Sequence, residues 1–230
     1  MWNGTLLPEQ GTRRRNALTG FLIAGLYSVF YLLALDNGMT PGALATLLGA
    51  QPILTIFLTE RRATALRLLG LTCARAGLAL VVSDGLASMR FDLLGLAFAG
   101  LSLAGITAGS ILQKREKQTP WVVLPMQYAV ALAFAAAVSP FGDFRASWDA
   151  GFILPVLWLG LVISVGTTFL LYRLIARGNL VNVTSLFYLV PGVTAAMDWA
   201  FLGNPMSSLM MGGLALVVVG LLIVFRYNAG

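Results

Sequence analysis

The amino-acid sequence predicts an all-α polytopic membrane protein with eight transmembrane helices, and three observations carry this prediction. Hydrophobic residues make up 58% of the 230 residues and charged residues only 10%. Such a chain has too little polar surface to cover a water-soluble globule. Eight apolar runs of about 20 residues follow one another, each long enough for a hydrocarbon core about 30 Å thick. The basic residues are confined to the short connections between these runs.

The composition excludes several other classes of protein. The net charge of +6 would point to nucleic acid in a soluble domain, but basic loops between apolar runs set membrane topology instead. We therefore expect no nucleic-acid partner. Cys73 is the only cysteine and the chain has no histidine, so we expect neither a disulfide framework nor a metal site.

Taken in order, the chain begins with a polar segment, residues 1–16, which we expect to lie in the cytoplasm. It shows no pattern of a cleaved signal peptide. The predicted membrane helices cover residues 17–35, 39–58, 64–83, 92–112, 121–139, 152–173, 180–200 and 207–225. The connections between them are short, and none resembles a linker or a second domain.

Two stretches of the chain resemble each other. Residues 43–80 and residues 182–223 each hold an apolar helix with a central proline, a short polar hairpin and a second helix with two glycines seven residues apart. The paired positions are Pro52 with Pro191, Gly70 with Gly213, and Gly77 with Gly220. This similarity indicates a duplicated unit in which helices one to three match helices six to eight.

The repeat is inverted, because Pro52 lies on the second helix and Pro191 on the seventh, and these helices cross the membrane in opposite directions. Many secondary transporters have inverted repeats with interrupted helices, since two such halves can exchange inward-open and outward-open shapes around a midplane site. A proline in a membrane helix can also be a tolerated kink without function. Two prolines at matching repeat positions favour a substrate site between the two helices over a tolerated kink.

These residues carry a resemblance to a known family. The relevant segments are GALATLLGAQPILT, TERRATALRLLGL and the stretch that runs from LGLVISVGTTFLLYR to NPMSSLMMGGLALVVVG. They resemble the two halves of an EamA-type permease of the drug/metabolite transporter superfamily, over residues 17–225. The resemblance implies ten inner-membrane helices in two inverted five-helix repeats that move amino acids, drugs and other small metabolites. Asn204 departs from it, because the family usually has a glutamate after the penultimate helix.

The family's first two helices have no counterpart in this chain. Residues 17–83 would hold helices one to three, the remainder of the first repeat, and residues 92–225 would hold helices four to eight, a complete second repeat. We expect polar midplane groups to face lipid where the two helices are missing, at about 1–3 kcal/mol for each unsatisfied group. The chain is then either a shortened permease with weak or no transport, or a variant that associates with a second chain, for example as a homodimer.

Polar residues within the predicted helices are the candidates for substrate binding. Gln51 with Thr55, and Tyr27 with Tyr31, are four residues apart and share a helix face. We predict a midplane cavity flanked by the Pro52 and Pro191 kinks. Its lining would be Gln51, Tyr31 and Tyr188, with Ser185, Thr168 and Tyr27 at its edge. Such a lining suits a small polar or zwitterionic, partly apolar molecule. The alternative is that the hydroxyls bond to the preceding helical turn and the glutamine joins two helices.

Two charged residues lie inside the predicted helices. Arg75 falls near the centre of the third helix, where an arginine costs about 2.5–3.5 kcal/mol on insertion scales. It is either a counter-ion for a substrate carboxylate or a side chain in a packed polar pocket or an oligomer contact. Its uncharged repeat partner, Val218, favours the packing role. Asp198 either carries a coupling proton or reaches the membrane interface.

The residues give no support to an enzyme. The sequence shows no histidine, no paired intramembrane carboxylates and no buried serine and lysine dyad. The phosphate loop G-x-x-x-x-G-K-[ST] is also absent, so ATP is not expected to power transport directly. We predict a secondary transporter without a cofactor, whose partners are a small-molecule substrate and the lipid bilayer. The competing prediction is a non-transporting accessory protein or an inactive permease remnant.

The distribution of basic residues predicts the orientation. With both termini in the cytoplasm, only Arg90 and Arg145 fall outside the cell inner membrane. The twelve basic residues that fall inside are Arg13, Arg14, Arg15, Arg61, Arg62, Arg67, Lys114, Arg115, Lys117, Arg173, Arg177 and Arg226. Cysteine introduced at Ser88 or Ser147 should therefore react with an impermeant reagent applied outside the cell. Outside labelling near Lys114 would contradict this topology.

Overall fold

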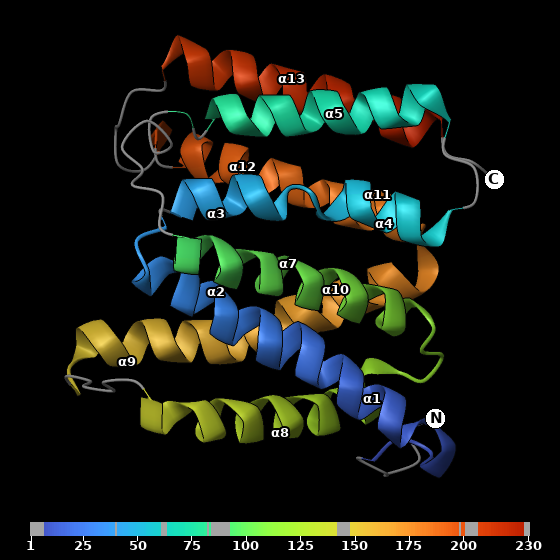
Figure 1. Ribbon diagram of the computed structural model, residues 1–230, viewed down its shortest axis with the longest axis vertical. Helices are drawn as coiled ribbons and strands as arrows, with labels where there is room; N and C mark the ends of the chain where they lie inside the picture. The colour runs from blue at the N-terminus through green and yellow to red at the C-terminus, as the bar shows by residue number, and fades with distance from the viewer. Residues whose placement is uncertain are drawn as a thin grey trace. The chain divides into compact units, whose positions relative to one another are not determined.

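The computed structural model describes residues 7–39, 41–60, 64–81, 83, 93–141, 148–197, 199–200 and 207–227, and every regular element in them is helical (Figure 1). Five helices in this part of the chain are long and apolar enough to cross a membrane. They are Gln10–Asp36, Leu93–Lys114, Pro120–Val138, Ala150–Arg177 and Ser208–Arg226. The predicted all-α fold is confirmed, and these helices fit a multi-pass membrane protein.

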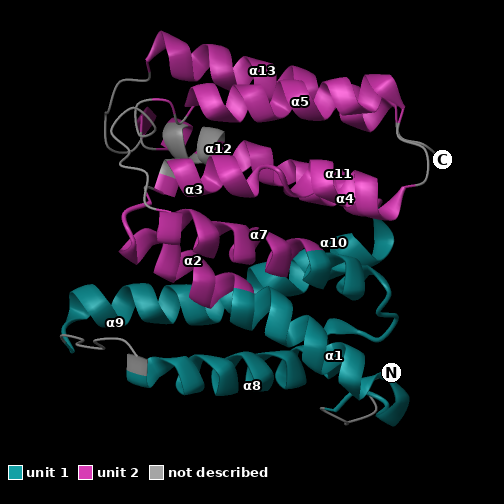
Figure 2. Ribbon diagram, viewed as in Figure 1, with its two compact units in different colours: residues 1–26, 108–178 teal, residues 27–107, 179–230 magenta. Residues whose placement is uncertain are grey.

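The chain forms two compact units that interleave along the sequence (Figure 2). Unit 1 comprises residues 1–26 and 108–178, and unit 2 comprises residues 27–107 and 179–230. Each unit takes residues from both of the predicted repeats, so the compact units are not the repeats. The division of the chain into an incomplete and a complete repeat stays a prediction.

Unit 1 is built around the packing of α1 against α8. Its elements are η1 (Gln10–Thr12), α1 (Arg13–Gly20), η2 (Phe21–Leu26), the end of α7 (Leu93–Lys114), α8 (Pro120–Val138), η3 (Ser139–Phe141), α9 (Ala150–Leu157), η4 (Trp158–Thr167) and α10 (Thr168–Arg177). Gly20 lets the two helices approach closely, because a Cβ there would fall onto the backbone of Gln127. The rings of Phe21 and Phe134 then meet edge to face, with centroids 4.9 Å apart.

Unit 2 holds a buried apolar core. Its elements are α2 (Tyr27–Asp36), α3 (Pro41–Leu48), α4 (Gln51–Thr59), α5 (Ala65–Val81), most of α7, α11 (Leu180–Ser185), η5 (Leu186–Tyr188), α12 (Leu189–Met197) and α13 (Ser208–Arg226). The core residues are Ile56, Leu71, Ala74, Leu78, Val181, Tyr188, Val217, Leu221 and Val224. They come from α4, α5, α11, η5 and α13, so these helices pack around one centre.

Helices occupy all eight of the predicted apolar runs. The first helix begins at Gln10, inside the predicted polar segment 1–16, and the other boundaries differ by no more than four residues. Local polar groups set several of the starts. The side chains of Asp149 and Ser207 accept hydrogen bonds from backbone N–H groups in the first turns of α9 and α13. Asn179 does the same for α11. Such N-caps satisfy donors that have no partner within the helix.

Two of the eight runs are interrupted about one turn before a proline. α3 ends at Leu48 and α4 begins at Gln51, with Pro52 in its first turn. In the other run the 3₁₀ turn η5 separates α11 from α12, which contains Pro191. Proline has no N–H and its ring clashes with the carbonyl four residues earlier. The regular α-helix is therefore interrupted near the residue to whose carbonyl the proline cannot donate, about one turn before the proline.

The closest helix packing in unit 2 joins α5 and α13 through glycines. A Cβ on Gly77 would lie 2.5 Å from the carbonyl oxygen of Gly213, and a Cβ on Gly220 would lie 2.6 Å from the carbonyl oxygen of Gly70. Small residues at these positions let the two backbones touch, which is how many membrane helices associate.

Gly213→Ala should destabilise the protein, whereas Gly212→Ala should not. A methyl group at position 213 meets backbone atoms, with Gly77 O at 2.7 Å and Val81 N at 2.9 Å, so the helices must separate. Overpacking of this kind costs about 1–3 kcal/mol. Nothing lies within 4 Å of the same position on Gly212. In thermal unfolding of detergent-purified protein, Gly213→Ala should melt several degrees below Gly212→Ala, and equal melting temperatures would contradict the packing.

Candidate functional site

The two interrupted helices of unit 2 meet at one hydrogen bond. The Tyr188 hydroxyl, in η5, donates to the carbonyl oxygen of Gly49, in the turn between α3 and α4, at 2.5 Å. A glycine suits this position, because a Cβ would lie 3.2 Å from the Tyr188 ring and 2.5 Å from the end of the Leu78 side chain, and both side chains would have to shift. A carbonyl freed by a helix interruption needs such a partner, since the bilayer core holds no water to replace it.

Polar side chains gather around this contact and are shielded from solvent. Gln51 is 4% exposed, Tyr188 1% and Ser185 0%. The Ser185 hydroxyl donates to the Val181 carbonyl of its own helix. Thr55 lies one turn beyond Gln51, and its buried hydroxyl has no hydrogen-bond partner among the described residues. The interruption therefore offers hydrogen-bonding groups about midway along two apolar runs.

The two tyrosines of the first predicted helix lie on α2 in the same unit. The rings of Tyr27 and Tyr31 have centroids 5.8 Å apart. Tyr31 packs against an apolar cluster from α2, α3 and α7 that includes Leu44 and Ala99. The Tyr27 carbonyl accepts a hydrogen bond from the Ser102 hydroxyl of α7 at 3.0 Å. The Tyr31 side chain and the Tyr27 backbone thus hold α2 to its neighbours.

Thr168, on the sixth predicted helix, belongs to unit 1, whereas the other candidates for substrate binding belong to unit 2. Thr168 accepts a hydrogen bond from the Tyr128 hydroxyl at 3.2 Å and donates to the Ile163 carbonyl at 3.4 Å. Ser164 similarly donates to the carbonyl five residues earlier, at 2.9 Å. The hydroxyls of this helix therefore bond within their own π-helical turns, as the alternative interpretation expects.

The remaining candidates have different surroundings. Pro52 is buried in the first turn of α4. Arg75 is exposed on α5 and interacts electrostatically with Tyr188, so it lies near the interruption. Asp198 and the side chain of Pro191 lie outside the described residues.

A buried ion pair in unit 2 was not indicated by the sequence. Arg67 is 0% exposed, and its Nη1 donates to both carboxylate oxygens of Glu60, at 2.6 and 2.7 Å. Its Nη2 donates to the side-chain oxygens of Asn179 and Asn182, each at 2.9 Å. Asn179 in turn donates from Nδ2 to Glu60 at 3.2 Å. This cluster joins the connection between α4 and α5 to the start of α11.

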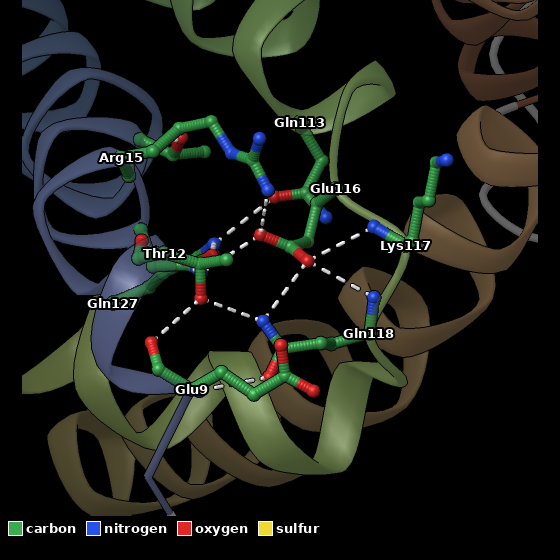
Figure 3. A network of polar contacts seen from close by, with 10 residues as sticks. Glu9, Thr12, Arg15, Gln113, Glu116, Lys117, Gln118 and Gln127 are labelled. Carbon is green, nitrogen blue, oxygen red and sulfur yellow. Dashed lines mark hydrogen bonds and ion pairs between the residues drawn. The ribbon is translucent and has the colours of Figure 1, made fainter.

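A second buried carboxylate follows the end of α7 in unit 1 (Figure 3). Glu116 accepts hydrogen bonds from Arg15 at 2.9 Å and from Asn16 at 2.8 Å, both on α1. Its other oxygen accepts from the backbone N–H groups of Lys117 and Gln118, each at 2.9 Å. Burial alone would raise the pKa of Glu116, but these hydrogen bonds outweigh it and hold the pKa below its usual value. Glu116 therefore ties the α7–α8 connection to α1 as an ionised group.

A cavity of about 400 Å³ lies beside Glu116 in unit 1. It is lined by Glu9, Thr12, Arg15, Arg115, Glu116, Lys117 and Gln118. These residues stand at helix ends and in a connection, and most are charged. The cavity therefore differs in place and chemistry from the predicted midplane cavity of tyrosine and glutamine.

The sequence carried only a weak signal for the two buried clusters. Asn179 follows a glycine and precedes an apolar run, which is typical of an N-cap. No comparable local pattern in the sequence predicts the hydrogen-bond partners of Glu60 and Glu116. Glu60 meets an arginine on its own hairpin, but Glu116 meets Arg15, which is 101 residues away. Only packing of the helices brings that second pair together.

Comparison with known proteins finds a shared fold. No protein-family model matches the chain, and no curated protein matches it. One solved structure, described only as the crystal structure of a protein, superposes with a TM-score of 0.77 and 19% sequence identity. The match covers 96% of this chain and 80% of the other. At this level of identity the likeness shows the fold alone.

Glu116→Gln should lower the melting temperature at neutral pH and lose this effect in acid. Because the pKa of Glu116 in the folded protein lies below its ordinary value of 4.5, ionised Glu116 stabilises the fold fully above that pH. Its contribution is lost as the pH falls through the lowered pKa and the carboxylate takes up a proton. The melting temperatures of the wild type and Glu116→Gln should differ at neutral pH and converge in acid. Glu9→Gln, at the exposed wall of the same cavity, serves as the control, and a difference independent of pH would contradict the assignment.

Proposed function

We propose that the chain is a secondary transporter, which moves a small amino-acid-like or drug-like molecule across the inner membrane by alternating access. The contact between the two helix interruptions, from Tyr188 to Gly49, carries the proposal. Transporters commonly bind their substrates where interrupted helices meet at the bilayer midplane. In this proposal Gln51, Ser185 and Tyr188 contact the substrate, and no cofactor takes part.

Three pairs of helices share an irregularity, which supports an inverted repeat. The first and sixth runs, Gln10–Asp36 and Ala150–Arg177, each contain a π-helical segment, η2 and η4. The second and seventh runs are interrupted ahead of a proline, and the third and eighth pack through glycines. π-Helical segments and interruptions are uncommon in helices. Their recurrence in matched order is what a duplicated unit would produce.

The contacts between α5 and α13 add support through their reciprocity. The sequence repeat pairs Gly70 with Gly213 and Gly77 with Gly220. In space Gly70 packs on Gly220, and Gly77 packs on Gly213. Such exchange of partners is typical of two copies related by a two-fold axis. On this basis we propose eight membrane crossings, two inverted copies and both termini in the cytoplasm, as in an EamA-type permease of the drug/metabolite transporter superfamily.

A second candidate is a chain that transports only together with a partner in the membrane. The helix Ala150–Arg177 favours it, since none of its most apolar 18-residue window is buried. A second copy of the chain would cover this surface and its hydroxyl groups. Alone, the chain would then be an accessory protein or an inactive permease remnant.

The first experiment is substrate-dependent thermal stabilisation of the purified protein across a metabolite library. A ligand at 100 times its Kd adds about 2.7 kcal/mol of stability, which is easily measured. Compounds that stabilise the protein are then tested for uptake into proteoliposomes. Size-exclusion chromatography of the same samples separates the two candidates, because full uptake by a strict monomer excludes the requirement for a partner.

Gln51→Leu and Tyr188→Leu should abolish uptake while leaving expression and monodispersity intact. Tyr188→Phe keeps the ring in the core and removes only the hydroxyl. It should weaken uptake and cost about 1–3 kcal/mol in stability, because the buried Gly49 carbonyl loses its partner. Phe187→Leu is the matched control, because Phe187 is the exposed neighbour in the same turn. Unchanged uptake in Gln51→Leu and Tyr188→Leu would exclude this site.

A further inference from the structure

The buried ion cluster of unit 2 stands where two half-helices end together. α4 is the second half of one interrupted run and α11 the first half of the other, and the two pack side by side (Figure 1). Glu60 follows the end of α4, and Asn179 caps the start of α11. The cluster therefore closes one end of a pair of half-helices whose other ends lie at the Tyr188 contact.

The bonds of the cluster divide into two kinds. The ion pair between Arg67 and Glu60 lies within one hairpin, because Glu60 follows the end of α4 and Arg67 lies in the first turn of α5. The bonds from Arg67 to Asn179 and Asn182, and from Asn179 to Glu60, cross to α11. Separation of α4 from α11 would break only the crossing bonds. The arginine would keep its carboxylate, so no lone charge would be left in the low-dielectric interior.

The arginine of the cluster has no charged match in the other copy of the repeat. Arg67 stands three residues before Gly70, and the residue three before the paired Gly213 is Met210. The distribution of basic residues assigns the side that carries Glu60 and Arg67 to the cytoplasm. Among the described residues, the ion cluster therefore closes the paired half-helices on that side of the membrane.

We propose that Glu60, Arg67, Asn179 and Asn182 form a latch that holds the cytoplasmic halves α4 and α11 together and biases the transporter towards its outward-open shape. The interruptions at Gly49 and Tyr188 are the hinges about which these halves separate. The latch rests on the proposed transport function, because a protein without two access states has no use for it. The latch would make the outward-open shape of the transporter lower in free energy than the inward-open shape.

The test measures access to the protein interior without any substrate. Thr184, on α11 between the latch and the interruption, is 1% exposed and is changed to cysteine in a Cys73→Ala background. Inside-out membrane vesicles are treated with an impermeant maleimide. Arg67→Met, which copies the repeat partner, should raise the labelling rate about tenfold, and Asn182→Leu, which removes one crossing bond, should raise it less. Asn182→Asp adds a carboxylate beside Arg67 and should slow labelling.

Arg177→Gln is the matched control, because it removes an exposed arginine assigned to the same side of the membrane. If Arg67→Met does not give monodisperse protein, Asn182→Leu and Asn182→Asp decide the question, since both leave the ion pair in place. Labelling rates that are equal in these folded variants, or that rise with Asn182→Asp, would overturn the latch. Because no substrate is used, absence of uptake contradicts the proposed transport function, while unchanged labelling contradicts the latch.

Discussion

The hydrogen bond between the Tyr188 hydroxyl and the Gly49 carbonyl is the contact on which the arrangement of unit 2 depends. Each interrupted helix leaves backbone groups without helical partners, and in a bilayer core an unpaired group costs several kcal/mol. The tyrosine of one interruption satisfies the carbonyl of the other, so the two irregular segments have to lie together. The lack of a side chain at Gly49 leaves room for the Tyr188 ring and for Leu78 of α5. One polar contact therefore joins the turn between α3 and α4 to η5.

Charged groups are used in both units to join helices at their ends. Glu116 joins α1 to the α7–α8 connection, and Glu60 with Arg67 joins α11 to the α4–α5 connection. In each case an asparagine amide also donates to the carboxylate, Asn16 to Glu116 and Asn179 to Glu60. Lys114 acts similarly at the end of α10, where its ammonium donates to the carbonyl oxygens of Ile175 and Gly178. These contacts fix helix ends, where polar groups cost less than they would at the bilayer midplane.

The middle of unit 2 and its ends therefore have different chemistry. The ends carry ion pairs and amides, whereas the interruption offers a tyrosine, a glutamine and hydroxyls between apolar helices. The proposed transport function needs such a division, because a substrate site must bind and release its cargo while the ends open and close. In that proposal the glycine contacts between α5 and α13 form the closely packed support for the shorter half-helices.

The sequence by itself determined the class of the protein and the positions of its helices. Apolar runs of membrane length, basic connections and the spacing of Pro52, Pro191 and the glycines were all readable, since each reflects local hydropathy or backbone chemistry. The interruption before each proline also follows from the missing N–H group. Gln51 and Tyr188 were identified as candidates because polar residues in apolar runs are rare.

Only the tertiary structure decided which of these residues meet. It joined Tyr188 to Gly49 across 139 residues and Arg15 to Glu116 across 101, and it assigned Thr168 to unit 1 and the other binding candidates to unit 2. It also buried Arg67, which as a basic residue near a connection had been assigned only a topological role. The reason is physical: hydropathy and helical period are properties of a short segment, whereas the partner of a polar side chain depends on which helices pack together.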